Sequence, residues 1–185
     1  MNVFDLRLET PRLILRPTAI EDFEGWAAFM ADAEAVQFIG GVQPRPVAWR
    51  GFVAMAGSWS IQRFAMFSVI EKASGRWVGR VGPWMPEGWP GTEVGWSIVR
   101  TAWGKGYATE AAAAAIDWAF DQLDWTEVIH TIAPANAASK GVAARLGSRH
   151  LSMGRLPAPF DADPIEIWGQ SREEWLARRA SGDPA

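Results

Sequence analysis

A glycine-rich turn, WGKGYATEA at Trp103–Ala111, constrains the fold of this chain more than any other stretch. It follows Thr92–Val99 (TEVGWSIV), a run of residues typical of a strand. It precedes an alanine-rich run that reaches about Leu123 and includes five consecutive alanines. These small side chains favour a helix and permit its close approach to a sheet or a ligand. The order strand, turn, helix predicts an α/β protein.

The turn has the composition of an anion site. Gly104 and Gly106 carry no side chain, so the backbone can curl and the amides of residues 104–109 can converge at the start of the helix. Exposed N–H groups at a helix N-terminus attract phosphate oxygens, and Lys105 adds a positive charge. The same glycines would also serve a tight turn without a ligand, so the turn by itself leaves both interpretations open.

Two familiar phosphate-binding motifs do not match this turn. The phosphate loop of nucleoside triphosphatases needs Ser or Thr after Gly-Lys, where this chain has Gly106. The dinucleotide-binding loop needs Gly or Ala where this chain has Thr109. A nucleotide-binding enzyme built on this turn is therefore the weaker hypothesis.

Composition excludes several classes of protein. The chain has 185 residues and no cysteine, which excludes disulfides, thiolate nucleophiles and cysteine-ligated metals, and its only histidines are His130 and His150. The net charge of −3 argues against a nucleic-acid surface. Charges such as Arg7 fall where a signal peptide needs an apolar run, and Asp117 interrupts the alanine-rich stretch. We expect a cytoplasmic protein that has no metal and binds neither nucleic acid nor membrane.

The rest of the chain predicts further elements around this unit. We expect strands at about 12–17, 63–71, 76–83, 127–133, 149–154 and 164–169, and helices at about 20–32, 47–61, 139–146 and 171–179. A capping-box spacing from Thr18 to Glu21 is expected to open the first helix. Because no linker or repeat interrupts the pattern, residues 1–180 are predicted to form a single α/β domain with mixed strand directions, followed by a loose tail at 181–185.

Four stretches fall in a characteristic order. They are LETPRLILRP at Leu8–Pro17, the strand with Glu93 two residues before Gly95, the glycine-rich turn, and NAAS at Asn136–Ser139 with Leu146-Gly147 after it. SREEW at Ser171–Trp175 follows them. In this order they resemble the GNAT superfamily of N-acetyltransferases, particularly its branch of ribosomal-protein acetyltransferases of RimJ/RimL type.

This resemblance implies a strongly twisted mixed sheet of about seven strands flanked by helices, in which the fourth and fifth strands (92–99 and 127–133) splay apart. It implies acetyl-CoA as the donor. Unpaired backbone groups of the fourth strand would bond the pantetheine arm, and the turn would hold the pyrophosphate. The cofactor-binding residues that it implies are Trp96, Ile98, Val99, Trp103, Gly104, Lys105, Gly106, Tyr107, Ala108, Thr109 and Asn136.

Acetyl transfer to an amine needs a base for the nitrogen. Glu93 is the first candidate, acting directly or through water, because desolvation on a strand that lines a dry cleft can raise the pKa of a carboxyl toward neutrality. A solvated strand-end residue is the alternative interpretation. Asp161, Asp163 and Glu166, near the closing strand, are alternative bases. A backbone N–H within 96–99 would stabilise the oxyanion, and transfer would be direct because no covalent nucleophile is evident.

The reaction also needs a proton for the departing sulfur. Many relatives have a tyrosine seven residues after the motif asparagine, where this chain has Ala143, and the single Tyr107 lies in the turn. Ser139 is therefore the candidate acid or water relay, although a serine there would equally suit an N-cap for the helix that follows. The missing tyrosine motivates an alternative function, namely an acyl-CoA-binding or sensor protein without useful turnover.

The aromatic residues divide between core and acceptor side. His130 is expected to be packed rather than catalytic. Among the tryptophans, we expect Trp26, Trp118 and Trp125 in the core, and we expect the wall of the acceptor pocket to include Trp49, Trp59, Trp84, Trp89 and Trp96. An aromatic pocket would suit an apolar or cationic amine, either a protein N-terminus or a small molecule. Whether the chain acts as a monomer or a homodimer stays open.

Overall fold

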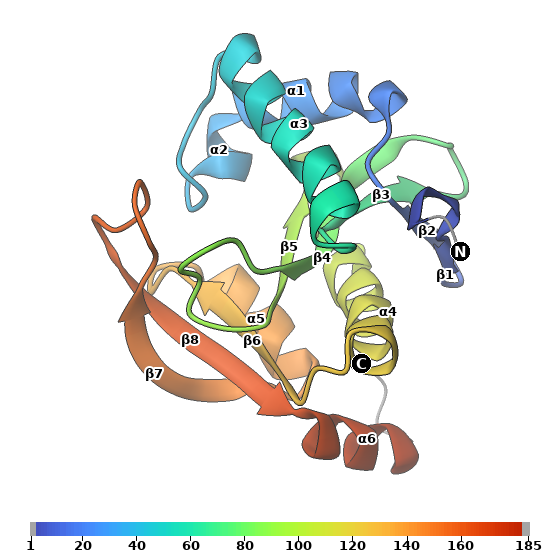
Figure 1. The fold of residues 1–185 in the computed structure, drawn as a ribbon, viewed down its shortest axis with the longest axis vertical. Helices are drawn as coiled ribbons and strands as arrows, with labels where there is room; N and C mark the ends of the chain where they lie inside the picture. The colour runs from blue at the N-terminus through green and yellow to red at the C-terminus, as the bar shows by residue number, and fades with distance from the viewer. Residues whose placement is uncertain (1–2, 183–185) are drawn as a thin grey trace.

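The protein is built on one mixed β-sheet (Figure 1), and the computed structural model describes residues 3–182. The strands are β1 (Leu8–Glu9), β2 (Leu13–Arg16), β3 (Phe67–Glu71), β4 (Trp77–Trp84), β5 (Glu93–Ile98), β6 (Glu127–Ile132), β7 (Arg149–Arg155) and β8 (Pro164–Ser171). They lie in the order β1-β2-β3-β4-β5-β6-β8-β7. Only β5 and β6 are parallel neighbours in this described sheet. The mixed α/β class is confirmed, and the sheet has eight strands rather than about seven.

The helices largely follow the predicted order. They are α1 (Phe23–Ala31), α2 (Ala33–Val36), α3 (Arg45–Ile61), α4 (Tyr107–Gln122), α5 (Ala137–Arg145) and α6 (Arg172–Ala180), with short 3-10 turns η1 (Val3–Asp5), η2 (Ile20–Asp22) and η3 (Arg100–Ala102). Within residues 3–182, no helix is both long and apolar enough to cross a lipid bilayer. Of the predicted tail, residues 183–185 lie outside the described residues.

Helices cover both faces of the sheet. Ser68 on β3 donates to Asp22, just before α1, whereas its neighbour Phe67 packs edge-on against Trp118 of α4. Because successive side chains of a strand point to opposite faces, α1 and α4 lie on opposite sides. The alanines of α4 are largely buried, and the helix packs on β4 and β5. Their small side chains account for this close packing.

The entry into the first helix differs from the prediction. The expected capping box between Thr18 and Glu21 does not form. Instead, the Asp22 carboxylate accepts from the N–H of Ala19 (3.0 Å) and forms two 2.8 Å bonds with the guanidinium of Arg16. Glu21 is exposed, with a single longer contact to Arg16. An ion pair from β2, which local spacing does not reveal, therefore fixes where the helix begins.

Two further boundaries differ because of local turns. The short helix α2 adds to the predicted set, and the Asp32 side chain caps it by accepting from the N–H groups of Glu34 and Ala35. Strand β3 begins at Phe67 rather than near residue 63, where Arg63 has a positive φ of 68°. That conformation is rare for a residue with a side chain and is incompatible with a strand.

The core contains most of the expected aromatic residues. Trp26 and Trp125 are buried and Trp118 packs against the core, as predicted. Trp59, expected on the acceptor side, is instead fully buried, and its Nε1 donates to the carbonyl of Met66 (3.3 Å). Its position late in α3 turns it inward onto the rings of Phe67 and Trp118. The assignment of Trp59 to the acceptor wall is therefore wrong.

Candidate functional site

Strands β5 and β6 diverge directly after they meet. Their register holds one pair, Glu93 with Ile129, next to a hydrogen bond from Ile129 N–H to Thr92 C=O (3.0 Å). Beyond this pair β5 continues beside β4, whereas β6 continues beside β8. We call this divergence, between residues 94–98 and 130–132, the split. It lies between the two strands for which the resemblance implied a splay.

His130 fills the beginning of the split. It is 1% exposed, its Nδ1 lies 2.7 Å from the carbonyl oxygen of Val94, and its Nε2 lies 2.9 Å from Ser148 Oγ. Burial lowers the pKa of His130 to about 4, so the ring is neutral near pH 7. In the tautomer that satisfies both contacts, Nδ1–H donates to Val94 and Nε2 accepts from Ser148. The expectation that His130 is a packed residue is confirmed.

Backbone groups of β5 point into the split at alternate residues. Val99 N–H donates to Val78 C=O on the β4 side (2.9 Å), and Val99 C=O accepts from Ala102 N–H (2.9 Å). Because bonded and non-bonded pairs alternate along an antiparallel ladder, Trp96 and Ile98 direct their N–H and C=O groups away from β4. Val99 thus uses both of its backbone groups within the chain, and a backbone bond from Val99 to a cofactor is no longer expected.

The Trp103 side chain forms a hydrogen bond with one of these backbone groups. Its Nε1 donates to the carbonyl of Ile98 at 2.8 Å, which folds the start of the glycine-rich turn back onto the end of β5. The N–H of Ile98 and both backbone groups of Trp96 remain directed into the split. They offer a second strand-like edge to an extended, amide-containing ligand.

The glycine-rich turn has the predicted conformation. Gly104 and Gly106 have positive φ angles of 75° and 78°. Gly106 is the N-cap of α4 and no side chain caps the first turn, which leaves the N–H groups of Tyr107, Ala108 and Thr109 free of side-chain acceptors among the described residues. A Cβ at Gly104 would meet nothing within 4 Å. This curled backbone at a helix N-terminus fits a phosphate group.

Glu71, which the sequence did not single out, holds the turn from β3. Its carboxylate accepts from Tyr107 Oη (2.7 Å) and lies 3.3 Å from Lys105 Nζ. Hydrogen bonds from Ser74, Tyr107 and Lys105 lower the pKa of Glu71 to about 2. Arg12 braces the same turn, since its Nη1 donates to the Lys105 carbonyl (2.8 Å). The single tyrosine is therefore a structural anchor of the turn rather than a proton donor at the split.

Asn136, rather than Ser139, caps the helix that follows. Asn136 is the N-cap of α5, and its Oδ1 accepts from the N–H of Ser139 (3.0 Å). The N-cap role considered for Ser139 is therefore wrong. Ser139 Oγ instead accepts from Trp96 Nε1 (3.2 Å), whose ring packs on His130 with centroids 4.7 Å apart. As an acceptor in this bond, the hydroxyl keeps its proton for another partner.

Glu93 is a buried carboxyl group at the start of the split. It is 5% exposed, which rejects the solvated strand-end alternative. Its Oε1 accepts from the N–H and Oγ1 of Thr131 (3.1 and 3.0 Å), and its Oε2 accepts from Trp89 Nε1 (2.5 Å). Desolvation outweighs these bonds and raises the pKa of Glu93 to about 7. A group with this pKa can take up and release a proton near neutral pH.

The alternative bases have different surroundings. Glu166 accepts from Trp168 Nε1 (2.7 Å) and pairs with Lys140 Nζ (3.1 Å), and these bonds hold the pKa of Glu166 below its usual value. Asp161 and Asp163 are exposed in the loop between β7 and β8. None of the three shares the buried environment of Glu93, so the geometry favours Glu93.

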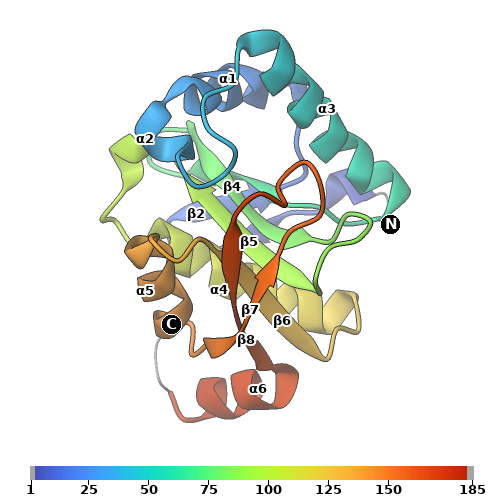
Figure 2. The same ribbon diagram turned by 90° about the vertical axis from the view of Figure 1, so that its left-hand side faces the viewer.

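Three loops lie side by side, and one of them reaches Glu93. A Cβ on Gly40, in the loop between α2 and α3, would lie 3.1 Å from the ring of Phe160 in the β7–β8 loop. A Cβ on Gly88, in the β4–β5 loop, would lie 3.5 Å from Pro157 of the same β7–β8 loop. Figures 1 and 2 both show these loops side by side, and Trp89 of the β4–β5 loop reaches Glu93. We call this set of loops (37–44, 85–92 and 156–163) the acceptor mouth.

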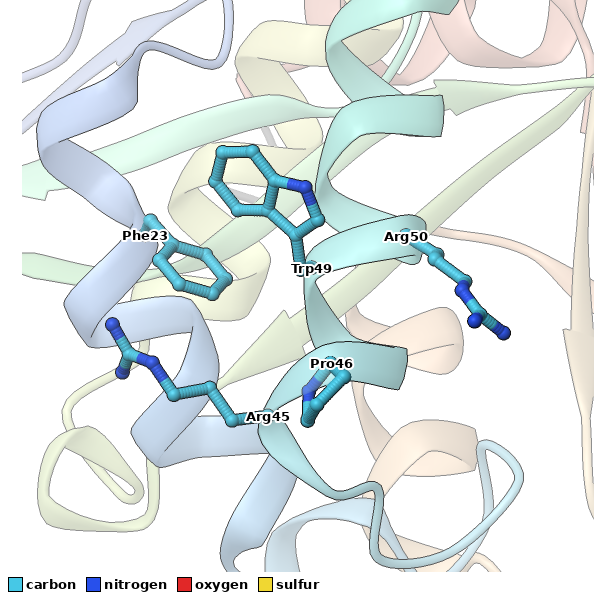
Figure 3. Close-up of a pocket in the computed structure, with 5 residues that line it drawn as sticks. All are labelled: Phe23, Arg45, Pro46, Trp49 and Arg50. Atoms are coloured by element: carbon cyan, nitrogen blue, oxygen red, sulfur yellow. The ribbon is translucent and has the colours of Figure 1, made fainter.

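Trp49 lines a different pocket. Figure 3 shows this surface pocket of about 590 Å³ between α1 and α3. Trp49 packs edge-on against Phe23 at 4.8 Å, and the Arg45 guanidinium lies 4.6 Å from the Phe23 ring centroid while it pairs with Glu24. Arg50 points away from this ring pair. No predicted catalytic or cofactor residue lines the pocket, and Trp49 is a member of this cluster.

The arrangement of turn, split and Glu93 provides a place for an extended phosphate-bearing ligand beside a titratable carboxyl. Among residues 3–182, no group of three or more His, Cys, Asp or Glu side chains has a metal-binding arrangement. The fold and this arrangement together define an N-acetyltransferase. Residues 12–149 match the acetyltransferase (GNAT) domain, and the chain belongs to the GNAT acetyltransferase family.

Individual relatives agree with this assignment. The uncharacterized N-acetyltransferase p20 of Bacillus licheniformis is 30% identical over 135 residues, which cover 71% of this chain and 76% of that protein. A crystal structure of an acetyltransferase from Agrobacterium tumefaciens has a TM-score of 0.77 at 29% identity, covering 90% of this chain and 95% of that one. Mycobacterium smegmatis RimJ in complex with CoA-disulfide has a TM-score of 0.69 at 19% identity, covering 92% and 90%, which shows a shared fold.

Proposed function

We propose that the protein transfers the acetyl group of acetyl-CoA directly to a primary amine while both substrates are bound. The amine belongs to a protein or peptide N-terminus or to a small molecule. The observation that carries the proposal is Glu93, a buried carboxyl with a pKa of about 7 at the point where the split meets the acceptor mouth. The CoA-disulfide bound to the RimJ neighbour supports a CoA-type ligand in this fold.

The residues present fit acetyl-CoA. The N–H groups of Tyr107, Ala108 and Thr109 would hold the pyrophosphate. The C=O of Trp96 and the N–H of Ile98 would bond the pantetheine arm, with the Asn136 amide on the opposite side of the split. When bound, acetyl-CoA supplies an acetyl thioester that is activated toward attack by an amine.

The chain's own groups then control protons and charge. Glu93 accepts a proton from the acceptor nitrogen, directly or through a water, because only the neutral amine is a nucleophile. The backbone N–H of Trp96, fixed in β5, stabilises the negative charge that develops on the acyl oxygen. Ser139, held by Trp96, can relay a proton to the departing sulfur, giving up its hydroxyl proton while it takes another from a water. No covalent enzyme intermediate is needed.

Glu93→Gln tests the assignment because glutamine keeps the size of the side chain and removes its basicity. We expect kcat to fall by roughly 10²–10⁴-fold, the usual contribution of a general base. In the wild type, kcat should rise with pH through about 7, because Glu93 must be deprotonated to act. The variant should lack this rise. The measurement is CoA thiol release from acetyl-CoA across a panel of primary amines and N-terminal peptides.

Glu87→Gln, in the exposed part of the β4–β5 loop, is the matched control and should leave the pH–rate profile intact. Acetyl-CoA affinity, measured by calorimetry, should be equal in all three proteins. An unchanged pH–rate profile in Glu93→Gln removes Glu93 from the mechanism. Tight acetyl-CoA binding by the wild type with no thiol release for any amine would support the alternative, a CoA-binding sensor.

A further inference from the structure

An arginine in the middle of β4 has no anionic partner among the described residues. Arg80 is largely buried, no acceptor bonds its enclosed Nε, and no carboxylate pairs with its guanidinium. Arg80 Cζ lies 4.4 Å from the ring centroid of Trp26, whose Nε1 is a second buried donor without an acceptor. Burial lowers the pKa of Arg80 to about 10, which still leaves the group charged at neutral pH. An uncompensated charge in such surroundings is destabilising unless a ligand offsets it.

Arg80 lies on the same face of the sheet as Glu93. The register pairs Arg80 with Ser97 and Trp84 with Glu93 across β4 and β5. Residues directly opposite each other, and residues two apart on one strand, point to the same face. Ser97 is only partly buried, and its hydroxyl has no partner within the described part of the chain. Arg80 and Ser97 are thus each partly exposed, so this row lies at the protein surface rather than in the closed core.

Two carboxylates that share this face are already bonded. Asp22 is 2% exposed, and it accepts from Arg16 (2.8 Å) and from Ser68 (2.7 Å). Glu93 accepts from Thr131 and Trp89. Neither carboxylate forms an ion pair with Arg80, so the face retains an unmatched positive charge beside an accessible hydroxyl. An unmatched positive charge beside a hydroxyl favours an amine acceptor that also carries an anionic group. It does not favour the purely apolar or cationic amine that an aromatic pocket would suit.

We infer that Arg80 and Ser97 form a subsite for an anionic group of the acceptor, a carboxylate or a phosphate, with the buried ring of Trp26 packed behind the guanidinium. The planar guanidinium donates to both oxygens of such a group. The inference rests on the proposed function, because it assigns the acceptor amine to Glu93 and the acceptor anion to Arg80.

The spacing along β5 limits the shape of the acceptor. Glu93 and Ser97 are four residues apart, which corresponds to about 13 Å between their Cα atoms at the rise of a strand. The acceptor therefore has its amine and its anionic group several bonds apart, as in a short peptide with a free C-terminus or an ω-amino acid.

The experiment compares 6-aminohexanoate and 6-aminohexyl phosphate with hexylamine, which has the same amine and no charge at the other end. In the wild type, kcat/KM should be at least about tenfold higher for an anionic acceptor than for hexylamine. Arg80→Met, which keeps the apolar stem, should abolish this preference by lowering kcat/KM for the anionic acceptors to the level of hexylamine, and should leave acetyl-CoA affinity unchanged. Ser97→Ala should reduce the preference for anionic acceptors in part. The two anionic arms decide between carboxylate and phosphate.

Arg50→Met removes an exposed arginine of α3 and controls for net charge, so it should keep the preference. Arg80→Lys, which keeps the charge, should restore part of the preference if Arg80→Met folds poorly. Calorimetric binding of the anionic amines in the presence of CoA tests the subsite without turnover. Anion binding that requires Arg80, without acetylation, would uphold the subsite and contradict the proposed function. Equal binding and rates for charged and uncharged amines in the wild type would overturn the subsite.

Discussion

Glu93 owes its chemistry to three neighbouring residues, Thr131, Trp89 and Gly95. Thr131 and Trp89 provide its hydrogen bonds, while Gly95 gives the carboxylate and the Met66 side chain room, since a Cβ at residue 95 would lie 2.6 Å from Met66 Cε and 3.3 Å from Glu93 Oε1. The bonds orient the carboxyl and the burial keeps its pKa near neutrality. A residue larger than glycine at position 95 would therefore collide with Met66 and crowd the Glu93 carboxylate.

The raised pKa of Glu93 predicts a pH dependence of stability. The pKa of this group changes from 4.5 in the unfolded chain to about 7 in the folded one, so between these values the folded state holds a proton that the unfolded state has lost. This contribution to stability is fully present below about pH 4.5 and is lost as the pH rises through 7. The loss amounts to about 3 kcal/mol.

Glu93→Gln should remove this loss. Urea unfolding at pH 5 and pH 8 should show a larger drop in the free energy of unfolding for the wild type than for the variant. Other titrating groups, including His130, are common to both proteins and cancel in the comparison. Glu87→Gln should behave as the wild type does, and an equal drop in the wild type and Glu93→Gln would show that folding does not raise the pKa.

At the level of elements, the glycine-rich turn is held by strands that are distant in sequence. Arg12 of the region before β2 bonds the Lys105 carbonyl, and Glu71 of β3 bonds Tyr107 and Lys105. The turn is thus fixed by its neighbours before any phosphate binds. Part of the charge of Lys105 is directed at Glu71, so the backbone amides carry more of the proposed phosphate contact than the lysine does.

Gly106→Glu tests the turn. It places a side chain at a φ of 78° and a negative charge at the proposed phosphate site. We expect acetyl-CoA binding to be lost in calorimetry. Gly75→Glu is the matched control, because Gly75 has a φ of 67° in the turn between β3 and β4 and a Cβ there would meet nothing within 4 Å. It should be strained to a similar extent and still bind, whereas retained affinity in Gly106→Glu would refute the site.

The sequence predicted what depends on local order and missed what depends on distant contacts. The strand–turn–helix unit and the position of His130 inside a strand follow from residue types within short windows, whereas the raised pKa of Glu93 depends on burial in the folded chain. The hydrogen bond of Trp103 to Ile98, the Glu71 anchor and the Asp22–Arg16 pair join residues through the fold, and no spacing rule reveals them. The buried position of Trp59 was also not predictable, because the sequence does not show which face of its helix this tryptophan occupies.

At the scale of the whole molecule, the acceptor mouth gathers loops from three separate parts of the chain. The α2–α3 loop touches the β7–β8 loop at Gly40 and Phe160, and the β4–β5 loop approaches it at Gly88 and Pro157. The glycine-rich turn lies at the opposite end of β5 from Glu93. Donor and acceptor are therefore expected to approach the split from different sides, as transfer within a ternary complex requires.

Phe160→Ala should separate the two binding events. Phe160 is 45% exposed and packs at the acceptor mouth, so its removal should raise KM for the amine by roughly 3–10-fold, the effect of losing a modest apolar contact. The Kd for acetyl-CoA should not change. Leu176→Ala, an exposed apolar residue of α6, should alter neither quantity. A parallel loss of acetyl-CoA affinity in Phe160→Ala would place the loop on the donor side instead.

His130 has a consequence for how a cofactor enters. Its ring bonds the Val94 carbonyl that a continuing β6 would otherwise bond, so contacts within the chain itself hold the two strands apart. A ligand that inserts there as a surrogate strand has no interstrand hydrogen bonds to break first. The binding free energy of the ligand is therefore not reduced by a cost of separating β5 from β6. Because the ring stays uncharged at physiological pH, the width of that slot is insensitive to acidity over the range in which Glu93 titrates.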